Sequence, residues 1–372
     1  MTAPGDSTIP APRANPDLAG HEAAERELRR LFETGRLPHA LLLSGPRGIG
    51  KSTLAFRLAR FVLARPAGAL GDLLGGSAAP DTGDGLWVDP ESGVFRRIAA
   101  GGHADLVTVE RAYDPRRRRL RGEIVVDDTR EIGGFLRLTP AEGGWRVVIV
   151  DGADAMNRNA ANALLKILEE PPRQTLLLLV THSPGKLLPT IRSRCRRFPL
   201  APLTPPTLRA LLAGYRPDLG APEAEAVAAL AGGSIGLALD LAAAGGIDLY
   251  RVALALIRPG PELDLPALHE FADRLARPDA DDSYHLVADL LTGLLGRFAV
   301  AAARGSSLAE PALPGPLAEA ERAAMQRLRA AASRWAELRD TVAGRFSRAD
   351  GLNLDRKQAV LGAFFAIGEV AG

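Results

Sequence analysis

The chain has 372 residues, of which 47% are hydrophobic and 24% are charged, and its formal net charge is +2. This length exceeds one ordinary domain and predicts two or three, while the near-neutral charge argues against nonspecific coating of nucleic acid and permits local basic patches. No apolar run approaches the roughly 18 residues that span a bilayer, and the first 17 residues lack the apolar core of a secretory signal. We therefore expect a cytoplasmic protein with no membrane partner.

The first half of the chain alternates helical and extended patterns. Helical periodicity covers about 21–34, 51–64, 129–138 and 157–170. Short apolar runs that read as buried strands cover 37–44, 106–109, 124–126, 145–151 and 176–180. Residues 65–104 are rich in glycine with weak periodicity, and we expect loops there. Apolar strands that alternate with helices predict a parallel sheet covered on both faces, which is an α/β fold.

From Leu203 onward the pattern is helical. The expected helices cover about 204–216, 222–231, 236–244, 248–257, 264–276, 282–304, 317–346 and 355–370. The turn signals at 259–261 mark a boundary among them. We therefore expect four segments: a loose lead-in over 1–17, an α/β domain over 18–202, a small helical domain over 203–258 and a larger helical domain over 259–372.

A glycine-rich turn joins the first strand to the second helix. The segment comprises Gly45, Pro46, Arg47, Gly48, Ile49, Gly50, Lys51, Ser52 and Thr53, and it fits the pattern G-x-x-x-x-G-K-[ST]. Glycines in this context let successive backbone N–H groups face phosphates at the positive end of a helix. Lys51 would contact the β and γ phosphates, and the Ser52 hydroxyl would bind Mg²⁺. The segment predicts a site for ATP with Mg²⁺.

The chain contains few lysines and a single cysteine, which limits the kinds of binding site that it can form. Only four of the 46 basic residues are lysines, and one of the four is Lys51. A retained lysine in a chain so rich in arginine points to a place where a compact ammonium group is needed. The only cysteine is Cys195, which excludes an internal disulfide framework and any zinc site built from cysteines, so no zinc is expected.

Asp151 ends the apolar strand that lies about a hundred residues after the glycine-rich turn. In P-loop proteins such an aspartate holds the Mg²⁺ that accompanies the nucleotide. Many ATPases place a glutamate next to it to orient the attacking water, and here that position is Gly152. Asp154 follows, and two interpretations stay open: a catalytic carboxylate or an exposed cap near the next helix. The pattern predicts Mg²⁺ binding and weak or no intrinsic ATPase activity.

Three segments resemble the clamp-loader ATPases, a family that includes bacterial clamp loaders and eukaryotic replication factor C. Residues 159–172 are similar to the stretch that follows the family's second acidic strand, residues 190–195 to its Ser-Arg-Cys motif, and residues 37–46 to the entry of its phosphate loop. The resemblance covers about residues 18–205. It implies a AAA+ P-loop domain, a helical lid domain over 203–258, and an all-α collar domain over 259–372 that holds a five-subunit ring.

Arg194 is the arginine of the Ser-Arg-Cys segment. The resemblance implies that it reaches the γ-phosphate bound on the adjacent subunit, as an arginine finger acting in trans. The alternative is a solvated arginine among Arg192, Arg196 and Arg197. Cys195 fits a small buried packing residue better than a nucleophile, because no Cys-His arrangement surrounds it.

Two further family positions are the nucleotide sensors. The polar sensor 1 residue aligns with Thr181 or His182, at the end of the 176–180 strand. The sensor 2 arginine of the Gly-Ser-x-Arg pattern is replaced by Gly236, which removes a γ-phosphate contact. Gamma/tau chains and many of their partner chains in the family carry a four-cysteine zinc module, but residues 65–104 contain no cysteine, and this difference counts slightly against the interpretation that follows.

Within the family, these differences favour a subunit that donates an arginine finger but hydrolyses ATP poorly. The implied partners are gamma/tau and delta clamp-loader subunits in a hetero-pentamer, a sliding clamp and primed DNA. A self-sufficient ATPase motor of the gamma/tau kind and a AAA+ regulator unrelated to replication stay open as alternatives. No polymerase active site is visible. The basic run Arg116–Arg119 could contact DNA phosphate, although a solvated loop is favoured.

Overall fold

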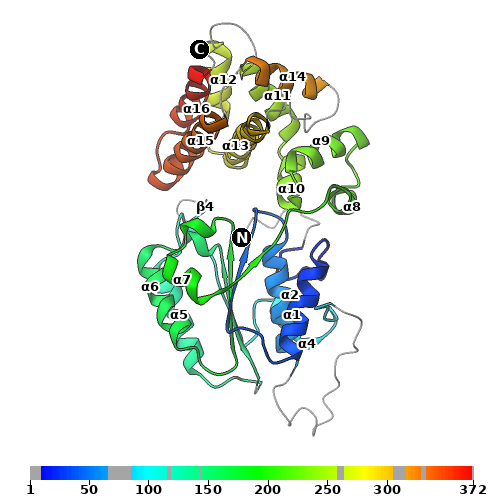
Figure 1. The fold of residues 1–372 in the computed structure, drawn as a ribbon, viewed down its shortest axis with the longest axis vertical. Helices are drawn as coiled ribbons and strands as arrows, with labels where there is room; N and C mark the ends of the chain where they lie inside the picture. The colour runs from blue at the N-terminus through cyan, green and yellow to red at the C-terminus, as the bar shows by residue number, and fades with distance from the viewer. Residues whose placement is uncertain are drawn as a thin grey trace. The chain divides into compact units, whose positions relative to one another are not determined.

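Figure 1 shows the computed structural model of the chain. It describes residues 10–65, 85–114, 119–142, 144–257, 264–304, 316–327 and 332–370. The chain divides into two units, Met1–Thr207 and Leu208–Gly372.

The first unit is built on a parallel sheet of five strands. In chain order these are β1 (Ala40–Ser44), β2 (Leu106–Val109), β5 (Arg146–Asp151), β6 (Thr175–Thr181) and β7 (Arg196–Pro199). Their spatial order is β2-β5-β6-β1-β7. Because β6 lies between β1 and β5, the carboxyl ends of the three strands meet at one edge: Ser44 is level with Thr181, and Asp151 with Val180.

Helices cover both faces of this sheet (Figure 1). One face carries α1 (Glu22–Glu33), α2 (Lys51–Leu63) and α4 (Gly93–Ala99), and the other carries α5 (Val126–Arg137), α6 (Arg158–Glu169) and α7 (Pro189–Arg194). Successive strand side chains point to opposite faces. Leu41 and Leu43 pack with the first set of helices, and Ala40 and Leu42 with the second. The predicted α/β fold, with apolar strands buried on both faces, is confirmed.

Residues just before α1 are anchored to α2, although a loose lead-in was expected there. Arg60 donates hydrogen bonds to the backbone carbonyls of Arg13 (3.0 Å) and Asn15 (2.8 Å). Arg57 donates to the carbonyl of Pro16. Apolar periodicity does not distinguish these two arginines from solvent-facing ones, yet Arg60 is only 1% exposed.

One predicted strand of the first unit is wrong. Ile124 makes only an isolated bridge with Met156, and α5 begins at Val126. The Asp128 carboxylate accepts a hydrogen bond from the Val125 backbone N–H at 2.8 Å, which stabilises the start of a helix. A three-residue apolar run does not by itself distinguish a strand from the first turn of a helix.

Other short elements were missed in the sequence. Strand β7 reads Arg-Arg-Phe-Pro and is mostly exposed, so it shows no apolar run; its proline is tolerated because the strand lies at the sheet edge. Helix α4 lies inside the expected loop region, where the Ser92 hydroxyl caps it by accepting from the Phe95 N–H at 3.2 Å. A two-stranded antiparallel ladder joins β3 (Tyr113–Asp114) to β4 (Arg119–Leu120).

Several expected features fall outside the described residues. These are residues 1–9 of the lead-in, 66–84 of the glycine-rich stretch, Arg116–Arg118 of the basic run and the 259–261 turn.

The second unit is helical throughout its described residues, as predicted. Its helices, the first of which begins in the first unit, are α8 (Pro205–Tyr215), α9 (Ala221–Ala231), α10 (Ile235–Ala243), α11 (Gly246–Ile257), α12 (Leu265–Leu275), α13 (Asp281–Ala303), α14 (Pro316–Arg327), α15 (Ala332–Leu352) and α16 (Arg356–Val370). The helix expected over 317–346 corresponds to α14 and α15, with residues 328–331 between them outside the described part. Arg297 of α13 connects to Glu321 of α14 (2.9 Å) and to the Tyr250 hydroxyl of α11 (2.8 Å).

Helix α13 is long and rich in apolar residues, although no unbroken apolar run in it approaches 18 residues. Among the described residues it is the helix long and apolar enough, by length and composition alone, to cross a membrane. Its buried side chains include Tyr284, Leu291 and Phe298, and it packs against α11, α12 and α15 within the second unit. Burial among neighbouring helices is typical of the central helix of a helical domain.

Candidate functional site

The glycine-rich segment runs from β1 into α2, as predicted. Three of its glycines adopt positive φ: Gly45 at 151°, Gly48 at 73° and Gly50 at 100°. A Cβ at Gly45 would lie 2.5 Å from the Leu200 carbonyl oxygen, so that position accepts only glycine. The backbone therefore curls at the amino end of α2, where N–H groups of the first turn point outward.

Lys51 is the first residue of α2 and is 4% exposed. Its ammonium group donates a hydrogen bond to the Pro46 carbonyl of the same loop. Burial lowers the pKa of Lys51 to about 8, whereas the nearby carboxylates of Asp151 and Asp154 raise it and Arg47 lowers it further. A buried ammonium at the amino end of a helix carries a charge that an anionic ligand would help to compensate.

Ser52 and Thr53 follow Lys51 in the first turn of α2, with Thr53 buried. The Ser52 hydroxyl is therefore carried by the same turn as Lys51. Asp151 ends β5, separated from the loop strand β1 by β6. The sheet thus brings together the predicted nucleotide and Mg²⁺ residues at its carboxyl edge, while binding of ATP or Mg²⁺ stays a prediction.

Asp154 belongs to this edge and is not an exposed cap. Its side chain is 7% exposed, and it accepts hydrogen bonds from the Thr181 hydroxyl at 2.8 Å and from the His182 backbone N–H at 3.3 Å. The cap of α6 is Asn157, which accepts from the Ala160 N–H at 3.0 Å. Asp154 therefore ties the 3₁₀ turn after β5 to the end of β6.

His182 lies in the same electrostatic environment. Its Nε2 is 3.6 Å from an oxygen of Asp154. The His182 side chain is 42% exposed, and its partial burial lowers the pKa of His182, an effect that Asp154 opposes and that Lys51 and Arg47 reinforce. Both candidate sensor 1 residues thus contact Asp154: Thr181 through its hydroxyl and His182 through its backbone N–H and, at longer range, its ring.

Gly152 departs from the catalytic pattern in conformation as well as in side chain. Its φ is 79°, in the left-handed region, although a Cβ there would meet no atom within 4 Å. A glutamate at this position would therefore find space but would force a strained backbone. At the second sensor position, Gly236 lies in the first turn of α10, and Ser234 caps that helix by accepting from the Leu237 N–H at 3.0 Å.

Sequence reasoning missed His21. Its side chain is buried, and its Nε2 lies 2.6 Å from the Ile49 carbonyl oxygen of the glycine-rich loop. Because the carbonyl can only accept, the ring nitrogen donates. His21 precedes α1 directly, where a capping residue would be expected, so the sequence carried no sign of a contact with the loop 28 residues away.

Arg194 lies at the end of α7, two residues before β7. Its guanidinium pairs with the Glu169 carboxylate at 2.8 Å and donates to the Thr190 carbonyl at 3.0 Å, while 36% of its side chain stays exposed. Cys195, by contrast, is buried in the core beside Ile191, and burial raises its pKa to about 11. Its role as a packing residue is confirmed.

The pairing of β7 with β1 locates Arg194 relative to the glycine-rich loop. Arg196 is level with Leu41, near the start of β1, and Pro199 is level with Ser44, at its end. Arg194 therefore lies at the amino edge of the sheet, whereas the loop follows Ser44 at the carboxyl edge. Sequence spacing did not reveal this separation.

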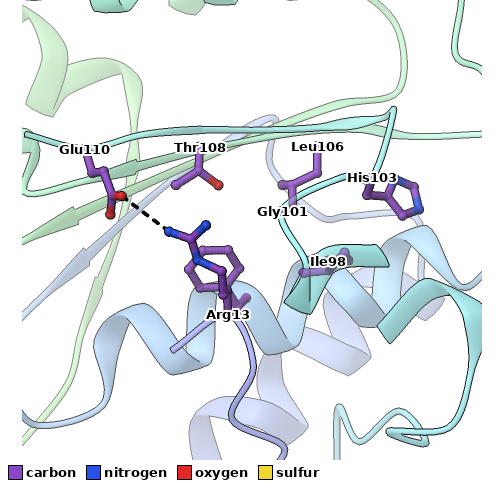
Figure 2. A pocket seen from close by; sticks show the side chains of 8 residues that line it. Arg13, Ile98, Gly101, His103, Leu106, Thr108 and Glu110 are labelled. Carbon is purple, nitrogen blue, oxygen red and sulfur yellow. Dashed lines mark hydrogen bonds and ion pairs between the residues drawn. The ribbon is translucent and has the colours of Figure 1, made fainter. Parts of the chain in front are cut away.

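A separate small pocket lies between the N-terminal segment, α2, α4 and β2 (Figure 2). Its cavity volume is about 160 Å³, and it is lined by Arg13, Phe56, Ile98, Gly101, His103, Leu106, Thr108 and Glu110. Arg13 pairs with Glu110 across it at 3.3 Å. The volume is below the roughly 300 Å³ of the smaller ligand pockets, and no predicted site residue lines it. No group of three or more His, Cys, Asp or Glu able to hold a metal ion occurs in the described ranges.

Comparisons with known proteins relate the chain to subunits of DNA polymerase III. A family model described as "DNA polymerase III, delta subunit" matches residues 20–204. The delta' subunit of DNA polymerase III from Pseudomonas aeruginosa is 42% identical over 201 residues, which cover 53% of this chain and 53% of that protein. The gamma/tau subunit from Mycobacterium tuberculosis is 34% identical over 292 residues, which cover 76% of this chain and 46% of that protein.

The chain thus spans about half the length of the curated relatives that it matches. A solved structure, a gamma subunit-related protein from Thermotoga maritima, covers 93% of this chain and 99% of that chain at 18% identity, with a TM-score of 0.41. A TM-score this low supports no conclusion.

The parallel sheet, with its glycine-rich loop between β1 and α2, defines an α/β module, and helices alone follow it in the described residues. The chain belongs to the clamp-loader subunit family of DNA polymerase III.

Proposed function

We propose that this chain acts as the delta' subunit of a bacterial clamp loader. In this role it binds ATP with Mg²⁺ at the phosphate loop and supplies Arg194 to the nucleotide site of an adjacent gamma/tau-type subunit. Together with delta it helps to place a sliding clamp on primed DNA in the cytoplasm. It has weak or no ATPase activity of its own and no polymerase site.

The observation that carries the proposal is the separation of Arg194 from the phosphate loop. The two lie at opposite edges of one sheet. A guanidinium at the amino edge lies apart from the chain's own loop and its side chain is 36% exposed, as a group that acts on a neighbouring subunit must be accessible. Its planar, permanently charged fork suits a phosphate oxygen.

The residues at the carboxyl edge fit a nucleotide with Mg²⁺. Lys51 supplies an ammonium, Ser52 a hydroxyl and Asp151 a carboxylate, which are the donor types that such a ligand needs. A bound Mg²⁺ would neutralise phosphate charge, while the chain's residues orient the phosphates and exclude water from Lys51. Gly152 offers no carboxylate to orient an attacking water, and Gly236 offers no guanidinium, so binding without efficient turnover is expected.

Steady-state ATPase of a loader reconstituted from this chain with gamma/tau and delta partners tests the proposal. Arg194→Ala should lower turnover at least about tenfold, or about 1.4 kcal/mol, while the complex still assembles. Arg197→Ala is the matched control, because it removes an exposed arginine from the neighbouring strand β7. Unchanged turnover in Arg194→Ala, or equal hydrolysis by this chain alone, would sink the delta' assignment.

A second candidate is a self-sufficient motor of the gamma/tau kind. The favouring observation is that the similarity to the mycobacterial gamma/tau subunit extends over 76% of this chain. In that case the isolated chain would hydrolyse ATP, and Lys51→Ala would abolish the activity. The family membership leaves the third candidate, a regulator unrelated to replication, without support.

A further inference from the structure

Glu169 is the acidic partner of Arg194. We propose that Glu169 is a positioning residue that orients Arg194 for its action on the neighbouring subunit. The inference rests on the proposed function, because it concerns the same arginine.

Two contacts restrict the movement of the Arg194 guanidinium without using all of its N–H donors. Glu169 meets Nη2 at 2.8 Å, and the Thr190 carbonyl accepts from Nη1 at 3.0 Å. Thr190 is four residues earlier in the chain, so the side chain folds back along its own short helix. A guanidinium has five N–H donors, and these contacts leave donors for the oxygens of a phosphate. A long side chain held at two points loses less freedom when a ligand arrives.

Glu169 is itself held in place by the end of α6. It is the last residue of that helix, and Leu168 before it is buried in the core. The Leu168 carbonyl lies 3.2 Å from His39 Nε2, which donates to it from just before β1. Pro171 and Pro172 prevent the helix from continuing. The carboxylate therefore projects from a defined helix end and not from a free loop.

Helix α6 spans the distance between the two edges of the sheet. It begins next to Asn157, shortly after Asp151 and Asp154, and ends at Glu169, beside Arg194 at the amino edge. Its twelve residues extend about 18 Å. Helix α6 therefore connects the carboxyl edge, which we propose binds nucleotide, to Arg194, which we propose acts on the neighbouring subunit.

The ion pair between Arg194 and Glu169 orients the arginine without immobilising it. The side chains of Arg194 and Glu169 are 36% and 48% exposed, and exposed ion pairs contribute little to stability. A phosphate oxygen in a neighbouring site can therefore recruit the guanidinium without first paying for a buried ion pair. This separates a positioning role, in which losing Glu169 slows turnover, from a sequestering role, in which losing it would speed turnover.

The test uses the reconstituted loader and compares Glu169→Gln with Glu170→Gln, which removes the adjacent exposed carboxylate. Glu169→Gln should lower kcat about three- to tenfold with KM and assembly unchanged, as expected when a reacting group is misoriented. Glu170→Gln should stay near wild type, and Glu169→Asp, which keeps the charge, should recover part of the loss.

The double variant Glu169→Gln with Arg194→Ala separates this inference from the proposed function. If Glu169 acts through Arg194, the double variant is no slower than Arg194→Ala alone. If Glu169→Gln is at least as fast as wild type, or slows turnover equally in the Arg194→Ala background, the positioning role is wrong while the finger stands. If Arg194→Ala itself has no effect, both proposals fail.

Discussion

The two edges of the sheet in the first unit hold their charged side chains in different ways. At the carboxyl edge, Lys51 is 4% exposed and the side chain of Asp154 is 7% exposed. At the amino edge, Arg194 and Glu169 pair in partial contact with solvent. Buried charges interact strongly and are costly to leave unpaired, whereas exposed pairs are weak and easily exchanged. The first arrangement suits a ligand that the chain holds itself, and the second suits a group that it lends to a partner.

The largest expected effect concerns which edge binds nucleotide. Lys51→Ala should weaken ATP binding by the isolated chain roughly 100-fold, or about 2.7 kcal/mol, because the buried ammonium is lost. Arg194→Ala is the control and should leave that affinity within about twofold, since it lies at the opposite edge. Titration with a fluorescent ATP analogue measures both. Equal losses in the two variants would mean that the edges do not differ in this way.

A smaller effect is expected at Gly152. Gly152→Glu restores the side chain of a catalytic carboxylate, but φ is 79° there, so unfolding free energy should fall by about 1–2 kcal/mol. ATP turnover by the isolated chain should not rise, because the strained backbone does not present the carboxylate correctly. Urea unfolding and an ATPase assay measure the two quantities.

Gly152→Ala provides the control for that change. It carries the same backbone strain without the carboxylate, so its loss of stability should match that of Gly152→Glu. If Gly152→Glu gains ATP turnover without losing stability, the missing glutamate alone limits hydrolysis by this chain, and the backbone at this position does not prevent it.

The smallest expected effect is a dependence of folding stability on pH that arises at the carboxyl edge. Partial burial lowers the pKa of His182 below its ordinary value of 6.5, and because the side chain is 42% exposed, solvent screening keeps the effect on stability small. As pH falls below about 6.5, the unfolded chain binds a proton that the folded chain resists, so stability decreases toward acid pH. His182→Gln should flatten this part of the profile in thermal unfolding between pH 7.5 and 5.5. If the stability of His182→Gln decreases with falling pH as steeply as that of wild type, another group causes the pH dependence.

Parts of this architecture follow from residues that are close in the chain. The glycine-rich loop was predictable because its shape depends on the local geometry of one strand, one turn and one helix. The apolar strands β1, β5 and β6 were predictable because both faces are covered. Strand β7 was not predictable in the same way, since an exposed edge strand needs no apolar run.

The environment of Asp154 could not be predicted in this way. Its partners Thr181 and His182 are more than 25 residues away, and their contact depends on β6 lying next to β5. From sequence alone, an exposed cap and a catalytic carboxylate were both open. Neither interpretation described a buried carboxylate that ties two strand ends together.

By itself, the sequence determined the class of the protein: an α/β module of the clamp-loader family, with an intact glycine-rich loop, no glutamate at position 152 and a Ser-Arg-Cys arginine. These features depend on residue identity and short spacing. Only the tertiary structure decided that Arg194 lies at the opposite edge from the loop and that Glu169 and Thr190 hold it. The physical reason is that strand order and register bring distant segments together, and no local pattern encodes which strands become neighbours.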